Sequence, residues 1–228
     1  YIATSTEEVN YLQDNLTPFL VPRVIEEAGV RIVGWENSGW RAFFYKSDTS
    51  IQKPEDLAKF KMRVPPNPLM IASYEAWGAN PIPLGWTELY NALQQGVVEG
   101  GDNPVTDVIG MKFYEVINRM TRFHYTILTH PIIVSESWYQ SLPEKHQKAI
   151  LRAGEEATAY VRWWQPMDEQ RWWAEAEKQG VIVDDIADET DWVEKARAIW
   201  GDYYHTIGPD GEAVANRALA ILDDYAKQ

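Results

Sequence analysis

The chain has 228 residues, a formal net charge of −13 at pH 7, 45% hydrophobic residues and no cysteine. The acidic surplus excludes a nucleic-acid partner, since binding to a phosphate backbone depends on lysine and arginine. The lack of cysteine excludes disulfides, thiolate metal sites and cysteine nucleophiles. There is no run of about 18 apolar residues, so the sequence predicts no stable membrane insertion.

The first 45 residues are predicted to form helices and then strands. Apolar positions at helical spacing, behind a capping serine, predict a helix over residues 6–20, and a second helix follows over 21–28. Gly29 ends this second helix. β-Branched and aromatic residues then predict strands over 30–35 and 40–45. The order of helix, glycine and short strand favours an α/β layered fold.

Glycine and proline divide the middle of the chain into short elements. Pro65 and Pro66 stop a strand because proline cannot donate to a strand ladder, and two glycines end helices. Residues 100–104 contain two glycines and an Asn-Pro pair, which predicts a loop. The other expected elements are a helix start at 53–57, a strand over 61–64, a helix over 69–77, an extended connector over 80–83 and a helix over 87–95.

The last hundred residues are predicted to be mainly helical. A strand over 130–135 precedes a long helix that begins near Glu144, reaches about Gln179 and is interrupted or bent near Pro166. A further strand over 180–183 and two C-terminal helices follow. The sequence has no internal repeat and no flexible linker, so two lobes would require the chain to cross between them more than once.

Two arginines are candidates for binding a carboxylate, because a guanidinium group matches a carboxylate in bidentate geometry. Arg63 lies in a short strand before two prolines, so its side chain can project into a cleft at the strand end, where α/β sheets place ligands. Arg41 lies among aromatic residues and can stack on a ring. From position alone, a surface role is favoured for Arg63 and equally open for Arg41.

Asn103 precedes a proline that would fix its orientation, and its amide offers both a donor and an acceptor. The alternative is a turn asparagine that caps a helix starting at Pro104. Trp86, just before a helix, can supply a flat apolar wall, and together with Trp40 it indicates a ligand with apolar or ring surface. The 11 tryptophans also raise the alternative of a carbohydrate-binding module that stacks sugars on tryptophan.

No pattern in the sequence indicates catalysis. A hydrolase needs a paired acid and base, or a nucleophile with its base. Glu99 with Asp102, and His124 with His130, are the available pairs, and no spacing identifies either of them. The sequence also lacks metal-ligand and phosphate-loop motifs. We therefore predict no catalytic residue, no metal and no cofactor.

Seven short motifs share an order and spacing that together are highly specific. They are G-W-R at 39–41, I-Q-K-P-E-D-L at 51–57, K-M-R-V-P at 61–65, G-A-N-P-I-P at 78–83, E-L-Y-N-A-L-Q-Q-G-V-V-E-G at 88–100, D-N-P at 102–104 and K-F-Y-E-V at 112–116. The stretch from about Gly34 to Leu142 thereby resembles the solute-binding proteins of tripartite ATP-independent periplasmic (TRAP) transporters, of the DctP type.

The resemblance implies that Arg63 forms a salt bridge with a ligand carboxylate and that Asn103, Arg41 and Trp86 belong to the same site, with Trp40 beside them. It implies a periplasmic, monomeric protein that captures a small organic acid, such as a sugar acid, and delivers it to a TRAP membrane permease. An enzyme acting on a small organic acid remains an alternative. The resemblance does not identify the acid.

The resemblance also implies two α/β lobes with hinge strands and a long lobe-spanning helix. We assign residues 1–38 and 129–169 to lobe I, and residues 39–128 and 170–228, with the main ligand-binding segments, to lobe II. Tyr1 is not a methionine, and relatives carry a longer N-terminal portion with the opening strands of lobe I. We therefore expect that portion to be missing from this sequence.

Overall fold

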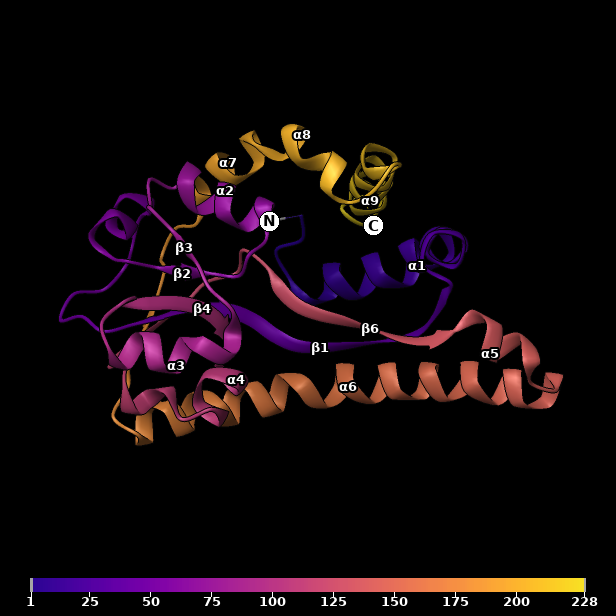
Figure 1. Cartoon of the computed structure of the whole chain (residues 1–228), viewed down its shortest axis with the longest axis horizontal. Helices are drawn as coiled ribbons and strands as arrows, with labels where there is room; N and C mark the ends of the chain where they lie inside the picture. Colours follow the sequence, from indigo (N-terminus) through magenta and orange to yellow (C-terminus); the bar gives the residue numbers. More distant parts are fainter. Residues whose placement is uncertain (1, 228) are drawn as a thin grey trace.

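The computed structural model describes residues 2–227, so Tyr1 and Gln228, the outer ends of the two predicted lobes, lie outside the described residues. The fold is α/β, as predicted, with a sheet flanked by helices (Figure 1). The strands are β1 (Val30–Tyr45), β2 (Arg63–Val64), β3 (Ile82–Pro83), β4 (Gly100–Pro104), β5 (Arg119–Arg122), β6 (Ile127–Ser135) and β7 (Ile182–Asp185). The helices are α1 (Thr6–Ala28), α2 (Pro68–Ala76), α3 (Trp86–Gln94), α4 (Val105–Gly110), α5 (Glu136–Ser141), α6 (Glu144–Lys178), α7 (Thr190–Ala198), α8 (Trp200–Tyr203) and α9 (Gly211–Tyr225), with 3₁₀ turns at Pro54–Lys59, Phe113–Glu115 and Tyr204–Thr206.

Strand β1 organises the main sheet. It is one strand of 16 residues, so the prediction of two separate strands over 30–35 and 40–45 was wrong. The first part of β1 pairs with β6 and its last part lies between β4 and β5, all antiparallel, while β7 runs parallel to β5. Two register shifts against β6, at Ile32/Gly34 and Asn37/Gly39, absorb extra residues as bulges and let the strand continue.

Helix α1 is also longer than predicted. Ser5 caps it and Gly29 ends it at a φ of 66°, as expected, but the helix continues through Pro18 and Pro22 instead of breaking into two. Proline removes a helical hydrogen bond and bends a helix more often than it divides it. Figure 1 shows α1 changing direction before it leads into β1.

The predicted loop at residues 100–104 is the buried strand β4. Its glycines serve close packing and not a turn. A Cβ atom added to Gly100 would lie 2.5 Å from the carbonyl oxygen of Phe44, and one added to Gly101 would lie 2.9 Å from the Phe44 ring. Because the backbone of β4 approaches β1 this closely, Asp102 and Asn103 are held in fixed register opposite Phe43 and Ala42.

Two cores lie on opposite faces of the sheet, because neighbouring residues of a strand point to opposite sides. Phe44 enters a core formed with α3, α4 and the end of α6, whereas Phe43 enters an aromatic core with Trp77, Phe123 and Trp192. These four aromatic side chains of the second core are all in mutual ring contact. The sheet is therefore fixed from both sides near the ends of β1, β4 and β5.

Helix α6 runs along the sheet (Figure 1) and is continuous through Pro166. Glycines bring it into contact with the β1 backbone: a Cβ atom on Gly154 would lie 1.8 Å from the Val33 carbonyl oxygen. One turn later, the Thr158 hydroxyl accepts a hydrogen bond of 2.8 Å from the Trp35 backbone nitrogen. The first β1 bulge, around Val33, therefore faces α6.

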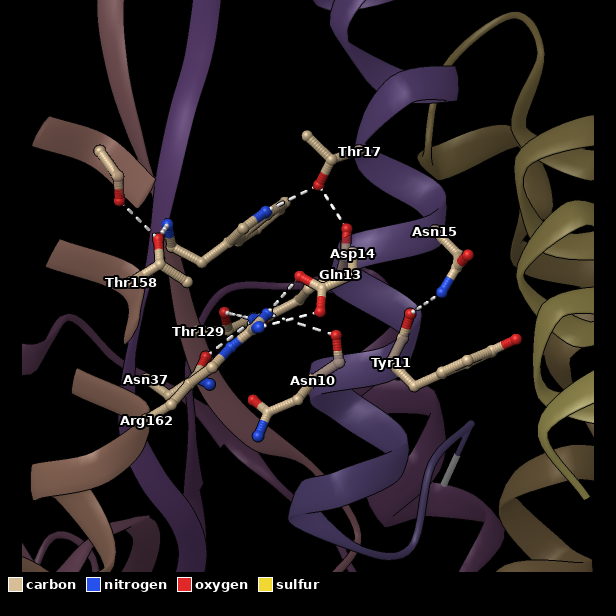
Figure 2. Close-up of polar contacts among 12 residues, drawn as sticks. Asn10, Tyr11, Gln13, Asp14, Asn15, Thr17, Asn37, Thr129, Thr158 and Arg162 are labelled. Atoms are coloured by element: carbon tan, nitrogen blue, oxygen red, sulfur yellow. Dashed lines mark hydrogen bonds and ion pairs between the residues drawn. The ribbon is translucent and has the colours of Figure 1, made fainter. Parts of the chain in front are cut away.

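A polar network joins α1, β1, β6 and α6 (Figure 2), and it is buried at Gln13 and Asn37 and exposed at Asp14. The Gln13 amide nitrogen donates to Asn37 and Thr129 at 2.9 and 2.8 Å. From α6, the Arg162 guanidinium reaches both carboxylate oxygens of Asp14 at 2.8 and 2.9 Å. These hydrogen bonds help to fix the relative placement of the four elements, although the buried Arg162 Nε has no partner among residues 2–227.

The C-terminal helix α9 packs against the N-terminal helix α1. The rings of Tyr11 and Tyr225 lie 5.0 Å apart, and Leu222 lies against the cluster of Ala3 and Val9. Residues 211–225, predicted to belong to lobe II, therefore contact a segment predicted to belong to lobe I. The division of the chain into two lobes stays a prediction.

We expect Gly154→Ala to destabilise the protein even though alanine favours a helix by about 1 kcal/mol over glycine. The added methyl group would overlap the Val33 carbonyl oxygen, and overpacking costs about 1–3 kcal/mol. Urea unfolding should show a lower free energy of unfolding. Gly201→Ala is the matched control, since a Cβ atom there meets nothing within 4 Å, and it should be neutral or stabilising. Equal effects of the two substitutions would contradict this account of the contact between α6 and β1.

Candidate functional site

A pocket of about 470 Å³ lies where β1, β2, β4 and β6 approach α3 and α4. Its lining includes four of the five predicted ligand-binding residues, which come from four different elements. The lining residues are Ser38, Arg41, Arg63, Pro65, Trp86, Asn103, Asp107, Met111, Leu128 and His130. The structure therefore brings these four side chains together, although Arg41 and Asn103 are 62 positions apart in the sequence.

Arg41 is paired within the protein. Its Nε donates to Asp102 Oδ2 at 2.5 Å, its Nη2 donates to the Asp102 carbonyl oxygen at 2.6 Å, and both side chains are buried. Burial alone would lower the pKa of Arg41, but the Asp102 carboxylate outweighs it and raises the pKa above its usual value. The Tyr125 hydroxyl also donates to Asp102. Arg41 thus brings no uncompensated charge to the pocket.

Arg63 differs from Arg41 in having no carboxylate partner among residues 2–227. Its Nε donates to the Leu84 carbonyl oxygen at 2.8 Å, and its guanidinium carbon lies 5.8 Å from the centre of the Trp86 ring. Burial lowers the pKa of Arg63, an effect that the more distant Asp102 only partly opposes. Arginine still remains protonated at neutral pH. The two Nη groups of Arg63 are therefore free to bind an anion in the pocket.

Asn103 is buried on β4 and does not cap a helix. Helix α4 begins at Val105 without a side-chain cap, and the Asn103 Nδ2 donates instead to Asp107 Oδ2 at 2.7 Å. The other polar atoms of the side-chain amide, Oδ1 and the second hydrogen on Nδ2, have no hydrogen-bond partner among the described residues. The amide is thus oriented by one contact, and the rest of its hydrogen-bonding capacity remains available at the pocket.

The two predicted tryptophans lie in different places. Trp86 begins α3 and stacks one face on Phe113, with ring centres 5.1 Å apart, while it also lines the pocket. Trp40 lines a separate apolar cavity beside α1, where its Nε1 donates to Thr6 at 3.2 Å. The structure therefore groups Trp86 with Arg63 and leaves Trp40 out of this group, because Trp40 and Arg41 point to opposite sides of β1.

Sequence reasoning missed two ionisable residues of this pocket, Asp107 and His130. Asp107 could have been found from its place one helical turn after Asn103, a spacing that brings two side chains together. His130 was considered only as part of a catalytic pair with His124. In the structure the two histidines have different partners, since His124 contacts Glu189 at 2.9 Å and His130 contacts Glu36 at 2.6 Å.

The second catalytic pair considered from the sequence is also not assembled. Glu99 Oε2 accepts from the Lys61 backbone nitrogen at 2.9 Å, whereas Asp102 is occupied by Arg41 and Tyr125. Within residues 2–227, no group of three or more histidine or acidic side chains could hold a metal ion. Across the same residues, none of the helices combines the length and apolar character needed to span a membrane.

The Arg41–Asp102 pair is predicted to be essential for stability. Asp102→Asn leaves a buried guanidinium without its counter-charge, which should lower the free energy of unfolding by about 3–5 kcal/mol. Asp185→Asn is the control, because the Asp185–Arg122 pair is exposed and should contribute less than about 1 kcal/mol. Chemical denaturation of both variants checks this, and a loss under about 1 kcal/mol for Asp102→Asn would contradict the assignment.

Comparison with known proteins identifies the family. Residues 1–206 match the family described as bacterial extracellular solute-binding protein, family 7, or DctP. A solute-binding protein from Sulfitobacter sp. (strain NAS-14.1) is 36% identical over 149 residues, and the 2,3-diketo-L-gulonate-binding periplasmic protein of Escherichia coli is 26% identical over 147 residues. These alignments cover 65% and 64% of this chain and 44% of each relative, so the matched part of the chain spans less than half the length of each of these two relatives.

Solved structures agree with this match. A TRAP periplasmic solute-binding protein from Rhodobacter sphaeroides, in an apo open form, has a TM-score of 0.88 and 37% identity, over 98% of this chain and 72% of that chain. A TRAP periplasmic solute-binding protein from Roseobacter denitrificans, with bound β-D-glucuronate, has a TM-score of 0.86 and 25% identity, over 96% and 72% of the two chains. The resemblance expected from the motifs is confirmed, and the chain belongs to the DctP family of bacterial extracellular solute-binding proteins.

Proposed function

We propose that this protein captures a small organic acid in the periplasm, through a salt bridge between Arg63 and the ligand carboxylate, and delivers it to a TRAP membrane permease. The observation that carries the proposal is the contrast between the two pocket arginines. Asp102 neutralises Arg41, while Arg63 has no anionic partner among residues 2–227. A buried cation without a counter-charge is costly, so binding an anion there is strongly favoured.

The remaining pocket residues fit the same role. Asn103 offers its carbonyl oxygen and an amide hydrogen to polar groups of the ligand, and Trp86 offers a flat apolar surface next to Arg63. Relatives support an acid as the ligand class: the Escherichia coli protein is named for 2,3-diketo-L-gulonate, and the Roseobacter denitrificans structure holds β-D-glucuronate. We propose that two lobes close on the ligand and that the permease recognises the closed form.

The alternatives receive less support. A carbohydrate-binding module would need exposed tryptophans around a sugar site, but Trp163 and Trp164, which are among the most exposed, lie on the outer face of α6 and away from the pocket. An enzyme would need an acid–base pair, and neither candidate pair is assembled. We therefore propose binding without turnover.

The proposal predicts that Arg63→Ala weakens binding of the carboxylate ligand by a factor of roughly 30 or more. Loss of one partner of a buried charge pair costs about 2–5 kcal/mol, and about 1.4 kcal/mol corresponds to a factor of ten. A thermal-shift screen of organic acids would first identify a ligand, since binding to the native state raises the melting temperature. Calorimetry with that acid then measures the affinity of each variant.

Arg152→Ala is the matched control, because Arg152 lies on the exposed face of α6 and pairs only with Glu156. This variant should bind the acid like the wild type. Circular dichroism should show that Arg63→Ala is folded, since Arg63 is in no ion pair that its loss would break. An Arg63→Ala protein that is folded and binds the acid with wild-type affinity would refute the proposed role of Arg63.

A further inference from the structure

Asp107 has no role in the function proposed above, although it lies in the same pocket. It occupies the first turn of α4, it is half-buried, and it lines the pocket together with Arg63 and Asn103. Its Oδ2 accepts the hydrogen bond from Asn103, whereas its Oδ1 has no hydrogen-bond partner among residues 2–227. One carboxylate oxygen is therefore available to a ligand.

The charged groups around Asp107 leave its carboxylate without a direct ion pair. Arg41 of β1 is held by Asp102, and His130 of β6 is held by Glu36 of β1. Burial raises the pKa of Asp107, and the nearby charge of Glu36 adds to this, while Arg41 and His130 oppose it. On β4, the neutral amide of Asn103 makes the only hydrogen bond to the Asp107 carboxylate found among the described residues. As far as residues 2–227 show, the pocket thus offers one cation without an anionic partner, Arg63, and one carboxylate oxygen without a hydrogen bond, on Asp107.

We propose that Asp107 selects organic acids that carry a single carboxylate together with a hydroxyl or ammonium group toward their other end, and that it rejects dicarboxylates. The inference rests on the proposed function, because it takes Arg63 as the group that binds the first carboxylate. A hydroxyl or ammonium group can donate to Asp107 Oδ1, which satisfies both partners. A second ligand carboxylate would instead face a group of like charge, and such a contact discriminates strongly between ligands.

A simpler role for Asp107 is to position Asn103, and the two roles predict different measurements. Positioning acts on whatever group Asn103 binds, so its loss would weaken binding of all carboxylates by a similar factor. Selection acts on the far end of the ligand, so its loss would change the ratio of affinities for two acids that differ only there. The ratio therefore separates the two roles.

D-Gluconate and D-glucarate are suitable probes, because they have the same six-carbon chain and differ only in a terminal hydroxymethyl group or a second carboxylate. Calorimetry at pH 7.5 should show that the wild type binds gluconate at least about tenfold more tightly than glucarate, the discrimination expected when like charges meet. In Asp107→Asn, the amide can donate to a carboxylate, so the ratio should fall to about one or reverse.

The matched control is Asp223→Asn, which makes the same change of charge at an exposed position of α9, away from the pocket. This variant should keep the wild-type ratio. Lowering the pH through the raised pKa of Asp107 should reduce the wild-type preference, because a protonated Asp107 can donate to the second carboxylate; in Asp107→Asn this pH effect should be lost.

Equal binding of the two acids by the wild type, or binding of neither, would overturn the proposed selectivity. So would an Asp107→Asn variant that loses affinity for both acids by the same factor, which is the result expected for positioning alone. None of these results touches the role of Arg63, because the proposed function is tested with whichever acid the thermal-shift screen identifies. If Arg63→Ala bound that acid as tightly as the wild type does, both the proposed function and the proposed selectivity would be refuted.

Discussion

The buried ion pair between Arg41 and Asp102 determines the electrostatics of the whole pocket. Two arginines reach the same cavity, and without Asp102 both would attract anions and repel each other. Asp102 is fully buried and accepts from Arg41 and Tyr125, so it compensates one guanidinium completely. Burial raises the pKa of Tyr125 well above its usual value, which keeps its hydroxyl a donor. Among residues 2–227, Arg63 is then left as the pocket guanidinium without a carboxylate partner, which is why Arg63 and not Arg41 is the proposed partner of the ligand carboxylate.

This arrangement depends on backbone contacts that only glycine permits. Gly100 and Gly101 bring β4 against β1 and thereby place Asp102 beside Arg41. On the other side, Gly154 brings α6 against the β1 bulge near Val33. Strand β1 is thus clamped by β4 near one end and by α6 along its length. The pocket lies beside the clamped end, so its charged groups are held rigidly before any ligand binds, which is the preorganisation that anion binding requires.

The sequence allowed prediction of elements whose signals are local, and it misled where tertiary contacts decide. The ends of α1 at Ser5 and Gly29, and the long helix α6, follow from capping and periodicity. The two glycines of β4 predicted a loop, but their role is to allow close packing. A Cβ atom on Gly100 or Gly101 would lie only 2.5 or 2.9 Å from Phe44, and the sequence cannot show this contact. Asn37 and Gly39 looked like a break between strands, whereas in the fold they accommodate a bulge of β1.

The motifs predicted which residues belong to the candidate site, but not how those residues are paired. Arg63, Asn103, Arg41 and Trp86 line one pocket, and that this pocket is the ligand site stays a prediction. The motif resemblance could not separate the arginine that Asp102 neutralises from the one without a carboxylate partner among residues 2–227. Trp40 directly precedes Arg41 in the sequence but lines a different cavity, because consecutive residues of a strand face opposite ways. The sequence did not indicate Asp107 as a site residue. Its place in the site depends on the hydrogen bond with Asn103 and on the pocket beside it, and neither can be read from a sequence motif.

The net charge of −13 and an anion-binding pocket are compatible because they act at different ranges. Exposed charges are screened beyond about 8 Å at physiological ionic strength, so the acidic surface weakly opposes the approach of an anion. Inside the pocket, screening is weak, and the potential is set by the few groups that line it. There Asp102 neutralises Arg41, and in the proposed function Arg63 binds the ligand carboxylate at close contact, where charge-assisted hydrogen bonds are strongest. An acidic protein can therefore bind an acid tightly, provided that one buried cation is left uncompensated.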